Sequence, residues 1–376
     1  MVLKRISSFF RSLPSLRGRQ AVRAYGLVGL GLFLFGGLLA LAYNFIFLPG
    51  SQLNPGGVAT FSSSPRSAEE ARDIPGPING TLFTATEAKV WQNRRPLAVI
   101  IENHVQSRPQ SGLSSADVVY EALAEGGITR NLAVYLTNPA SVSVGPIRSM
   151  RIYFLDWLEE YDAVAAYVGG NQVALQRIKT EQVKNLDQFY NGATYDRVYD
   201  RPSPHNVYTT TDRLWESAER KGYTGSSSFT SWKFKNEASV SARPSAQTLR
   251  LGFQGYASYK VSWEYNQSAN TYQRSVGGSP AVDRANNQPI LAKTIVVAVM
   301  NYKPGLSYPG DLAAKIDNVG TGKAYVLTDG VVTEGTWSKK SRTERTTFTD
   351  LNGAEISFNR GPIWIEVVPP GTPIEF

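Results

Sequence analysis

The chain has 376 residues, with 39 lysines and arginines against 31 aspartates and glutamates, which gives a formal charge of +8 and an isoelectric point near 9.4. Hydrophobic residues make up 42% of the chain and aromatic residues 11%, which is enough for packed cores and excludes a wholly disordered protein. Cysteine is absent, which excludes disulfide frameworks, catalytic thiols, cysteine-bound zinc and a lipidated cysteine.

The positive charge is concentrated at the N-terminus. Residues 1–24 contain six basic residues and no acidic residue, whereas the rest of the chain is nearly balanced. A short basic segment before an apolar run is typical of the cytoplasmic side of a membrane anchor. We therefore interpret residues 1–24 as a cytoplasmic tail, and we do not expect nucleic acid as a partner.

The next segment, from Tyr25 to Leu48, is an apolar run without any charged residue. At 1.5 Å per helical residue this run reaches about 36 Å, enough to cross a hydrocarbon core of about 30 Å. A cleaved signal peptide is the alternative, because Ala40 and Ala42 have the spacing of a cleavage site. Apolar residues continue beyond that site, so we favour an uncleaved single-pass anchor in membrane lipid, with the following residues outside the cytoplasm.

Beyond the anchor, the sequence predicts an α+β protein. Residues 49–95 are rich in proline, glycine and serine, which is typical of a flexible linker. Residues 96–224 alternate between strand-like and helix-like patterns and predict a mixed α/β domain. Residues 225–376 contain short alternating apolar runs separated by turn residues, which predict a β-rich domain.

Three segments of the first domain have strand patterns. Residues 97–103, LAVIIEN, are continuously apolar until their polar end, as in a buried strand. Residues 118–125 and 130–137 flank a Gly-Gly turn, and they predict a hairpin because β-branched and aromatic residues dominate them. The alternative at this point is a short helix capped by Ser115.

Two helices are expected on either side of a strand at residues 163–168. The first spans residues 150–161, where aromatic residues recur at helical spacing, and has Ser149 as its N-cap. The second spans residues 172–181 and has Asn171 as its N-cap. Turns between strands and helices are where α/β folds usually place ligands.

One segment of the second domain combines an aromatic residue with four basic residues: Trp337, Lys339, Lys340, Arg342 and Arg345. We interpret it as an exposed charged hairpin. A surface for anionic cell-wall polymers is the alternative.

Several multi-residue blocks occur in a fixed order along the outer region. The first domain contains RPLAVIIENHVQSRPQSGLSSADVVYEALAEGGITR, GPIRSMR, EYDAVAAYVGG and DRPSPHNVYT, and the second contains YQRSVGGSPAVDRANNQPILAKTIVV, VGTGKAYVL and GTWSKKS. With these blocks, residues 95–369 resemble the bacterial YerB-like family of surface lipoproteins. The resemblance implies a two-domain protein that is attached to a membrane and acts outside it, and it implies no particular activity. Members of the family commonly anchor through a lipidated cysteine, which this chain lacks, so the apolar run must replace it.

Several common chemistries have no residues to support them. His104 and His205 are the two histidines of the chain, so the H-E-x-x-H pattern of metalloproteases is missing. The chain also has no S-x-x-K, no G-x-S-x-G and no Walker-type phosphate loop. We therefore expect no metal, no cofactor and no nucleotide hydrolysis.

Polar residues at the predicted ends of strands in the first domain form the candidate binding site. Glu102 and His104 follow the first strand, where ligands of α/β folds usually lie. Arg148 and Arg151 flank the predicted helix start, where free backbone N–H groups attract anions. The ligand-binding candidates are Glu102, Asn103, His104, Arg108, Arg148, Arg151, Arg201, His205 and Asn206.

The same residues also have purely structural interpretations. Arg148 and Arg151 can pair with Asp156 or Glu160, and His104 can be a hydrogen-bonded loop residue. The alternating aspartates and arginines at residues 196–201 can stiffen a loop. The candidates favour a pocket only if they converge at one strand end.

Three functions remain open. The leading hypothesis is a membrane-anchored extracytoplasmic protein that binds an anionic or glycan component of the cell envelope, such as a cell-wall polymer. The alternative is a hydrolase or transferase acting on envelope glycans, with Glu102 or Asp200 as acid or base and with His104 or His205 assisting. The third is a structural scaffold for other membrane proteins, which is favoured if no cleft lies at the end of the first strand.

Overall fold

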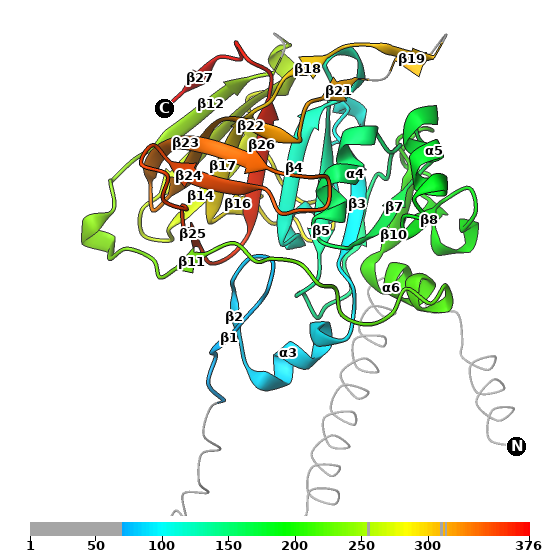
Figure 1. Ribbon diagram of the computed structural model, residues 1–376, viewed down its shortest axis with the longest axis horizontal. Helices are drawn as coiled ribbons and strands as arrows, with labels where there is room; N and C mark the ends of the chain where they lie inside the picture. Colours follow the sequence, from blue (N-terminus) through cyan, green and yellow to red (C-terminus); the bar gives the residue numbers. More distant parts are fainter. Residues whose placement is uncertain (1–69, 254–255, 309–310, 313) are drawn as a thin grey trace, which may run out of the picture. The chain divides into compact units, whose positions relative to one another are not determined.

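The structure of the protein, a computed structural model, describes residues 70–376 apart from residues 254, 255, 309, 310 and 313 (Figure 1). The predicted cytoplasmic tail and the predicted membrane span at residues 25–48 lie outside these described residues. Within the described part of the chain, no helix is both long enough and apolar enough to cross a membrane.

A mixed sheet of ten strands is built by both halves of the chain (Figure 1). From one edge to the other its strands are β24 (Thr347–Asp350), β23 (Val331–Lys339), β22 (Gly320–Thr328), β17 (Thr294–Val299), β26 (Ile363–Val368), β4 (Val118–Leu123), β5 (Thr129–Tyr135), β3 (Leu97–Glu102), β7 (Val164–Tyr167) and β8 (Asn185–Asp187). The halves meet where β26 pairs with β4 in parallel, with Ile363 opposite Val118. The predicted division at residue 225 therefore separates two segments that share one sheet.

Strand β3 is buried on both faces of this sheet. All six of its residues are buried, and alternate side chains enter two different cores. Ala98 and Ile100 pack on one face, whereas Val99 and Ile101 pack on the other. Its continuous apolar run is thus the pattern of a strand covered on both sides, as predicted.

The predicted hairpin is confirmed by β4 and β5, which pair antiparallel. Ser115 lies in a short 3-10 turn, Leu113–Ser115, and caps no α-helix. The hairpin places the start of β5 beside the end of β3, because β3 also pairs antiparallel with β5, with Glu102 opposite Arg130.

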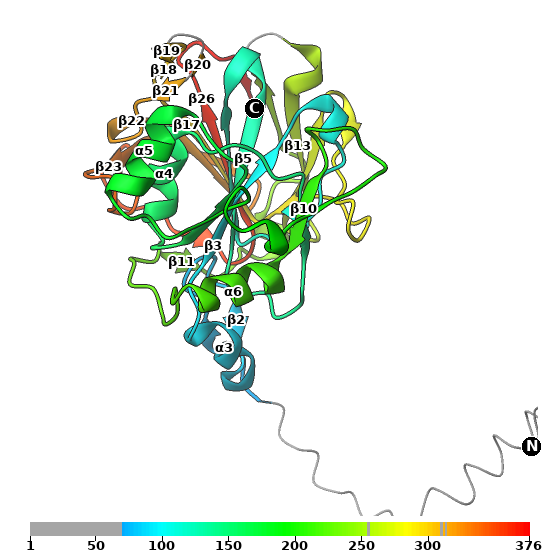
Figure 2. The same ribbon diagram turned by 90° about the vertical axis from the view of Figure 1, so that its right-hand side faces the viewer.

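Helices cover parts of both faces of the sheet. Trp91, Trp157 and Ile178 pack from three helices into the core on one face, whereas Leu214 packs from another helix into the opposite core. The helices are α3 (Ala85–Gln92), α4 (Ile152–Glu159), α5 (Gln172–Thr180) and α6 (Thr211–Arg220). Figures 1 and 2 both show α4 beside α5.

A second antiparallel sheet covers the opposite face, where its Trp263 and Tyr272 pack in the same core as Leu214. In spatial order its strands are β15 (Ser279–Pro280), β14 (Thr271–Val276), β13 (Lys260–Asn266), β12 (Thr248–Gly252) and β27 (Ile374–Glu375), and β16 (Leu291–Ala292) pairs with β14. The α+β fold and the β-rich second half are therefore confirmed.

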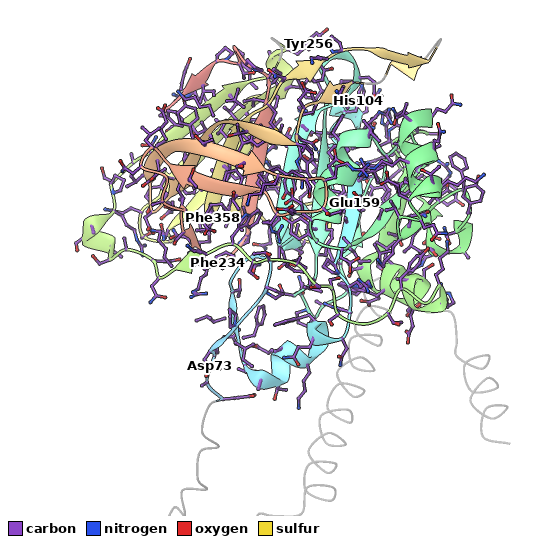
Figure 3. All side chains as sticks on the ribbon, viewed as in Figure 1. Asp73, His104, Glu159, Phe234, Tyr256 and Phe358 are labelled. Atoms are coloured by element: carbon purple, nitrogen blue, oxygen red, sulfur yellow. The ribbon has the colours of Figure 1, made fainter. Side chains whose placement is uncertain are left out.

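Short pairings connect the remaining segments. One three-stranded sheet consists of β6 (Ser143–Val144), β10 (Val207–Thr210) and β9 (Asp196–Arg197). The two-stranded pairs are β1 (Ile74–Pro75) with β2 (Leu82–Phe83), β11 (Phe234–Lys235) with β25 (Phe358–Asn359), β18 (Tyr302–Lys303) with β21 (Lys315–Ile316), and β19 (Leu306–Tyr308) with β20 (Asp311–Leu312). Strand β11 pairs with β25 in parallel, with Phe234 opposite Phe358 (Figure 3). The segment that connects the two halves of the chain therefore lies beside a strand close to the C-terminus.

The start of α4 differs from the prediction. Arg151 occupies its N-cap position and no side chain caps it, so the predicted Ser149 cap is wrong. The N–H of Met150 instead donates to the carbonyl of Gly169 at 2.9 Å, which keeps this segment extended. This tertiary pairing outweighs the local capping preference of serine. Asn171 does occupy the N-cap position of α5, as predicted, but its side chain makes no capping hydrogen bond.

The segment predicted to be an exposed basic hairpin is exposed only in part. Trp337, Lys339 and Arg345 are buried, whereas Lys340 and Arg342 are exposed. The Lys339 ammonium lies 2.6 Å from Oε1 of Glu160, and Nη1 of Arg345 lies 3.6 Å from Oε2 of the same carboxylate. The hairpin itself is confirmed by the antiparallel pairing of β23 with β24. The exposure predicted for Lys339 and Arg345 is wrong, because the carboxylate that allows their burial comes from a distant part of the sequence.

Candidate functional site

A pocket of about 330 Å³ lies where β3 ends and β5 begins. It is lined by Glu102, His104, Glu125, Ile128, Thr129, Arg130, Arg148 and His205. His104 lies at the end of the strands opposite to the end where Asp73 lies (Figure 3). The pocket thus occupies the strand end at which the sequence predicted a ligand site.

The buried carboxylate of Glu102 joins two other lining residues. Its Oε1 lies 3.0 Å from Nε of Arg148, and its Oε2 lies 2.9 Å from Nδ1 of His205. Among the described residues, neither Nη nitrogen of Arg148 has a protein partner. Glu102 therefore holds the side chains of Arg148 and His205 in place, and it leaves the two Nη nitrogens of Arg148 free to donate hydrogen bonds to a ligand.

The two histidines lie together although they are distant in sequence. Their rings stack with centroids 4.7 Å apart and planes 12° apart. Nδ1 of His104 accepts a hydrogen bond from the backbone N–H of Gln106 at 3.2 Å, so Nε2 carries the proton of the neutral ring. Burial, together with the charge of His205, lowers the pKa of His104 below its usual value. His104 is therefore a neutral N–H donor at pH 7.

Glu125, between β4 and β5, is held by two arginines. Arg151 donates to one of its oxygens, and Nη2 of Arg130 lies 3.4 Å from the other. Burial opposes ionisation of Glu125, but the Arg151 hydrogen bond and the charges of both arginines outweigh it and lower its pKa. Burial and the charge of Arg151 lower the pKa of Arg130 to about 10, so this guanidinium remains charged at pH 7.

The pocket and its immediate neighbours carry a positive balance. Arg130, Arg148 and Arg151 contribute three guanidinium groups, against the carboxylates of Glu102 and Glu125. Beneath the pocket, the Thr129 hydroxyl donates to the fully buried Glu121 at 2.6 Å, and Nη2 of Arg274 donates to the other oxygen of Glu121 at 2.5 Å. A side chain of the second half therefore supports the floor of the site.

Four of the nine residues predicted from sequence line the pocket: Glu102, His104, Arg148 and His205. Arg151 lies next to it through its contact with Glu125. Neither Arg148 nor Arg151 pairs with Asp156 or Glu160, so the structural interpretation that the sequence left open for them is wrong. Asp156 and Glu160 pair with Arg177 and Lys339 instead.

The other four predicted residues hold loops together and do not line the pocket. Asn103 is buried and donates to Glu121 at 2.9 Å, while Nε of Arg108 donates to the Asn103 side chain at 3.0 Å. Arg201 donates to the carbonyl of Pro109 at 2.7 Å and to the hydroxyl of Tyr208 at 2.9 Å. Asn206 accepts from Arg197 at 2.8 Å. These contacts fix the loops that present His104 and His205.

Sequence reasoning missed Glu125 and Arg130. Both flank the Gly-Gly turn of the predicted hairpin, and the turn alone gives no sign that it faces the end of β3. The signal would have been the pairing of β3 with β5, which places Arg130 opposite Glu102. That pairing is a tertiary relationship, which local patterns do not contain.

The comparisons with known proteins cover both halves of the structure. Residues 83–224 match the N-terminal domain, and residues 250–365 the C-terminal domain, of a family described as Protein of unknown function (DUF3048). The putative lipoprotein YerB of Bacillus subtilis (strain 168) is 31% identical over 305 residues, which covers 80% of this chain and 88% of YerB. A crystal structure of YerB from Bacillus subtilis matches with a TM-score of 0.70 at 28% identity, covering 81% of this chain and 100% of that chain. The two domain matches, their order and the shared fold show that this chain belongs to the YerB-like family of two-domain DUF3048 proteins.

Proposed function

We propose that this protein is a membrane-anchored extracytoplasmic binding protein whose pocket at the end of β3 holds an anionic group of a cell-envelope component, such as a cell-wall polymer or glycan. The observation that carries the proposal is the free guanidinium fork of Arg148, fixed beside the N–H donor His104 by the Glu102 carboxylate. The relative YerB is named a putative lipoprotein, which supports a location at the membrane surface. The apolar run at residues 25–48 supplies the anchor in this proposal.

The pocket is suited to a carboxylate or phosphate group. A planar guanidinium whose Nη nitrogens are free donates two parallel hydrogen bonds to two oxygens of such a group. Nε2–H of His104 can donate a further bond without carrying charge. Because Glu102 and the surrounding loops hold these donors before the ligand arrives, little conformational entropy is lost on binding.

The experiment is co-sedimentation of the full chain, purified in detergent, with isolated bacterial cell-wall material. Arg148→Ala should weaken binding about tenfold or more, since it removes a charged hydrogen-bond donor from the pocket. Arg220→Ala, which removes an exposed arginine at the end of α6, is the matched control and should bind like the parent. Undiminished binding by Arg148→Ala would contradict the assignment of the site.

A second candidate function is hydrolysis of an envelope glycan. The hydrogen bond between Glu102 and Nδ1 of His205 favours it, because a carboxylate in this position orients an imidazole as a general base. In this version Nε2 of His205 activates a water molecule. A purely structural scaffold receives less support, because a pocket does lie at the end of the first strand.

The hydrolase version is tested by incubating the full chain with purified cell-wall glycan and measuring new reducing ends. His205→Gln should abolish product formation while sedimentation with the wall material persists. If the parent protein releases no reducing ends under conditions in which it binds, the binding function stands and the hydrolase version is contradicted.

A further inference from the structure

A second and larger concavity is lined by Gly169, whose carbonyl accepts a hydrogen bond from Met150 in the segment that carries Arg148. It has a volume of about 1180 Å³, and α5, β8 and the turn after β8 form its walls. Its lining includes Tyr167, Gln176, Lys179, Asn185, Tyr190 and Lys221. We call it the aromatic cleft.

Two exposed aromatic side chains stand at this cleft. Phe189 is 71% exposed and Tyr190 is 85% exposed, and both line it. Exposed apolar side chains that cluster, unlike single ones, often belong to binding surfaces. These two consecutive aromatic residues make the cleft a candidate binding surface.

Hydrogen bonds hold the turn that carries these rings. The N–H of Tyr190 donates to the carbonyl of Asp187 at 3.0 Å, and the side-chain amide of Asn191 donates to the same carbonyl at 2.7 Å. Phe189 also packs on Gly169, where an added Cβ would lie 2.8 Å from Cε2 of the ring. Gly169 has a φ of +56°, so glycine suits this position both by conformation and by space. The rings are thus displayed on a fixed turn.

The polar groups of the cleft include side-chain amides, tyrosine hydroxyls, two ammonium groups and one carboxylate. Gln176 and Gln182 are exposed, and the lysines Lys179 and Lys221 are exposed as well. The lining carboxylate, Asp187, is buried and accepts from the backbone N–H groups of Gly169 and Phe189 at 2.9 and 3.2 Å. The charge that the cleft offers to a ligand is therefore positive.

From this combination we infer that the aromatic cleft binds a sugar chain that carries acidic groups. Pyranose rings have apolar C–H faces that stack on aromatic rings, and their hydroxyl groups pair with side-chain amides. The acidic groups of such a chain would meet Lys179 and Lys221. An apolar ligand would leave these lysines unused, and a neutral one would use only the rings and amides.

The cleft and the charged pocket share one piece of backbone. The N–H of Met150 donates to the carbonyl of Gly169 at 2.9 Å, and the N–H of Val168 donates to the carbonyl of Arg148 at 3.0 Å. Gly169 lines the cleft and Arg148 lines the pocket. The inference rests on the proposed function for the envelope setting and adds to it a separate site and a ligand class.

The test is calorimetric titration of the full chain in detergent with two probes, an acidic hyaluronan octasaccharide and neutral chitotetraose. The acidic probe should bind more tightly, and added salt should weaken it. Phe189→Ala and Tyr190→Ala should each weaken binding about tenfold. Tyr199→Ala removes a fully exposed aromatic ring outside the cleft, and should bind like the parent.

The inference would be overturned if Phe189→Ala and Tyr190→Ala bound the acidic probe as the parent does, or if Tyr199→Ala lost as much affinity as they do. It would also be overturned if the parent bound the neutral probe as tightly as the acidic one. Titration with inorganic phosphate separates this result from the charged pocket. Phe189→Ala and Tyr190→Ala should keep the phosphate binding of the parent. Absence of phosphate binding in every protein would count against the pocket alone.

Discussion

The imidazole of His104 stacks on that of His205 with ring centroids 4.7 Å apart, although the two residues come from loops that are far apart in the sequence. One ring is fixed by the backbone of Gln106 and the other by the carboxylate of Glu102. The pair closes one wall of the charged pocket.

Glu102→Gln should destabilise the protein by about 1–3 kcal/mol, because it removes the charge that pairs with Arg148 and His205. The free energy of unfolding in urea at pH 7 measures the effect. Glu264→Gln, which changes an exposed carboxylate on β13, is the control and should change stability by less than about 0.5 kcal/mol. Equal stability of the two variants would mean that Glu102 does not organise the pocket.

His104 should titrate below the usual pKa of histidine. Burial disfavours its charged form, and the charge of His205 adds to the effect. Its contribution to stability is therefore present above the usual histidine pKa, and it is lost as the pH falls through the lower folded value. Nitrogen-15 chemical shifts of the imidazole report the midpoint directly, and a midpoint at or above the usual value would refute the neutral N–H donor.

Part of the site could be predicted from local pattern and part could not. The unbroken apolar run of β3 fixes both the strand and the point where it ends, so Glu102 and His104 were found. Arg130 and the partner of His205 depend on which strands and loops pair, and the sequence alone contains no such information. The same limit explains Ser149, whose expected helix cap is replaced by pairing between Met150 and Gly169.

Burial of charge was the least predictable feature. A lysine among other basic residues normally indicates a solvated surface. Lys339 is instead 0% exposed because Glu160 and the carbonyl of Glu344 accept from its ammonium group at 2.6 and 2.7 Å. Glu344 is close to Lys339 in the sequence, but Glu160 is far from it, and only the folded structure brings Glu160 to the ammonium group.

Lys339→Met should therefore lower the free energy of unfolding by about 3–5 kcal/mol, because it leaves the buried Glu160 without its closest cation. The exposed neighbour offers a matched control, since Lys340→Met should change the free energy of unfolding by less than about 0.5 kcal/mol. Chemical denaturation of both variants checks the difference. Similar stabilities would contradict the buried ion pair.

Glu366→Gln should alter the pH dependence of stability. Burial and the nearby charge of Glu121 raise the pKa of Glu366 to about 8, and they outweigh the charge of Arg274, which acts in the opposite direction. The contribution of Glu366 to the free energy of unfolding is fully present below the unfolded pKa near 4.5, and it is lost as the pH rises through the folded pKa of about 8. Trp263 can still donate to the oxygen of a glutamine here.

Removing this titration should make Glu366→Gln more stable than the parent at pH 9, by about 1 kcal/mol or more. At pH 5 the two proteins should be much closer in stability. Unfolding curves measured across this range give the comparison. A constant difference at every pH would show that Glu366 does not titrate in this window.

Both histidines of the chain line the pocket, so their imidazole signals report directly on a ligand bound there. Nitrogen-15 spectra of the imidazoles are recorded for the full chain during titration with inorganic phosphate and with soluble cell-wall fragments. If the pocket holds an anionic group beside Arg148, the signals of His104 and His205 shift together and saturate, and Arg148→Ala removes the shift. Histidine signals that stay unchanged while the wall fragments bind would show that the pocket does not hold the anionic group.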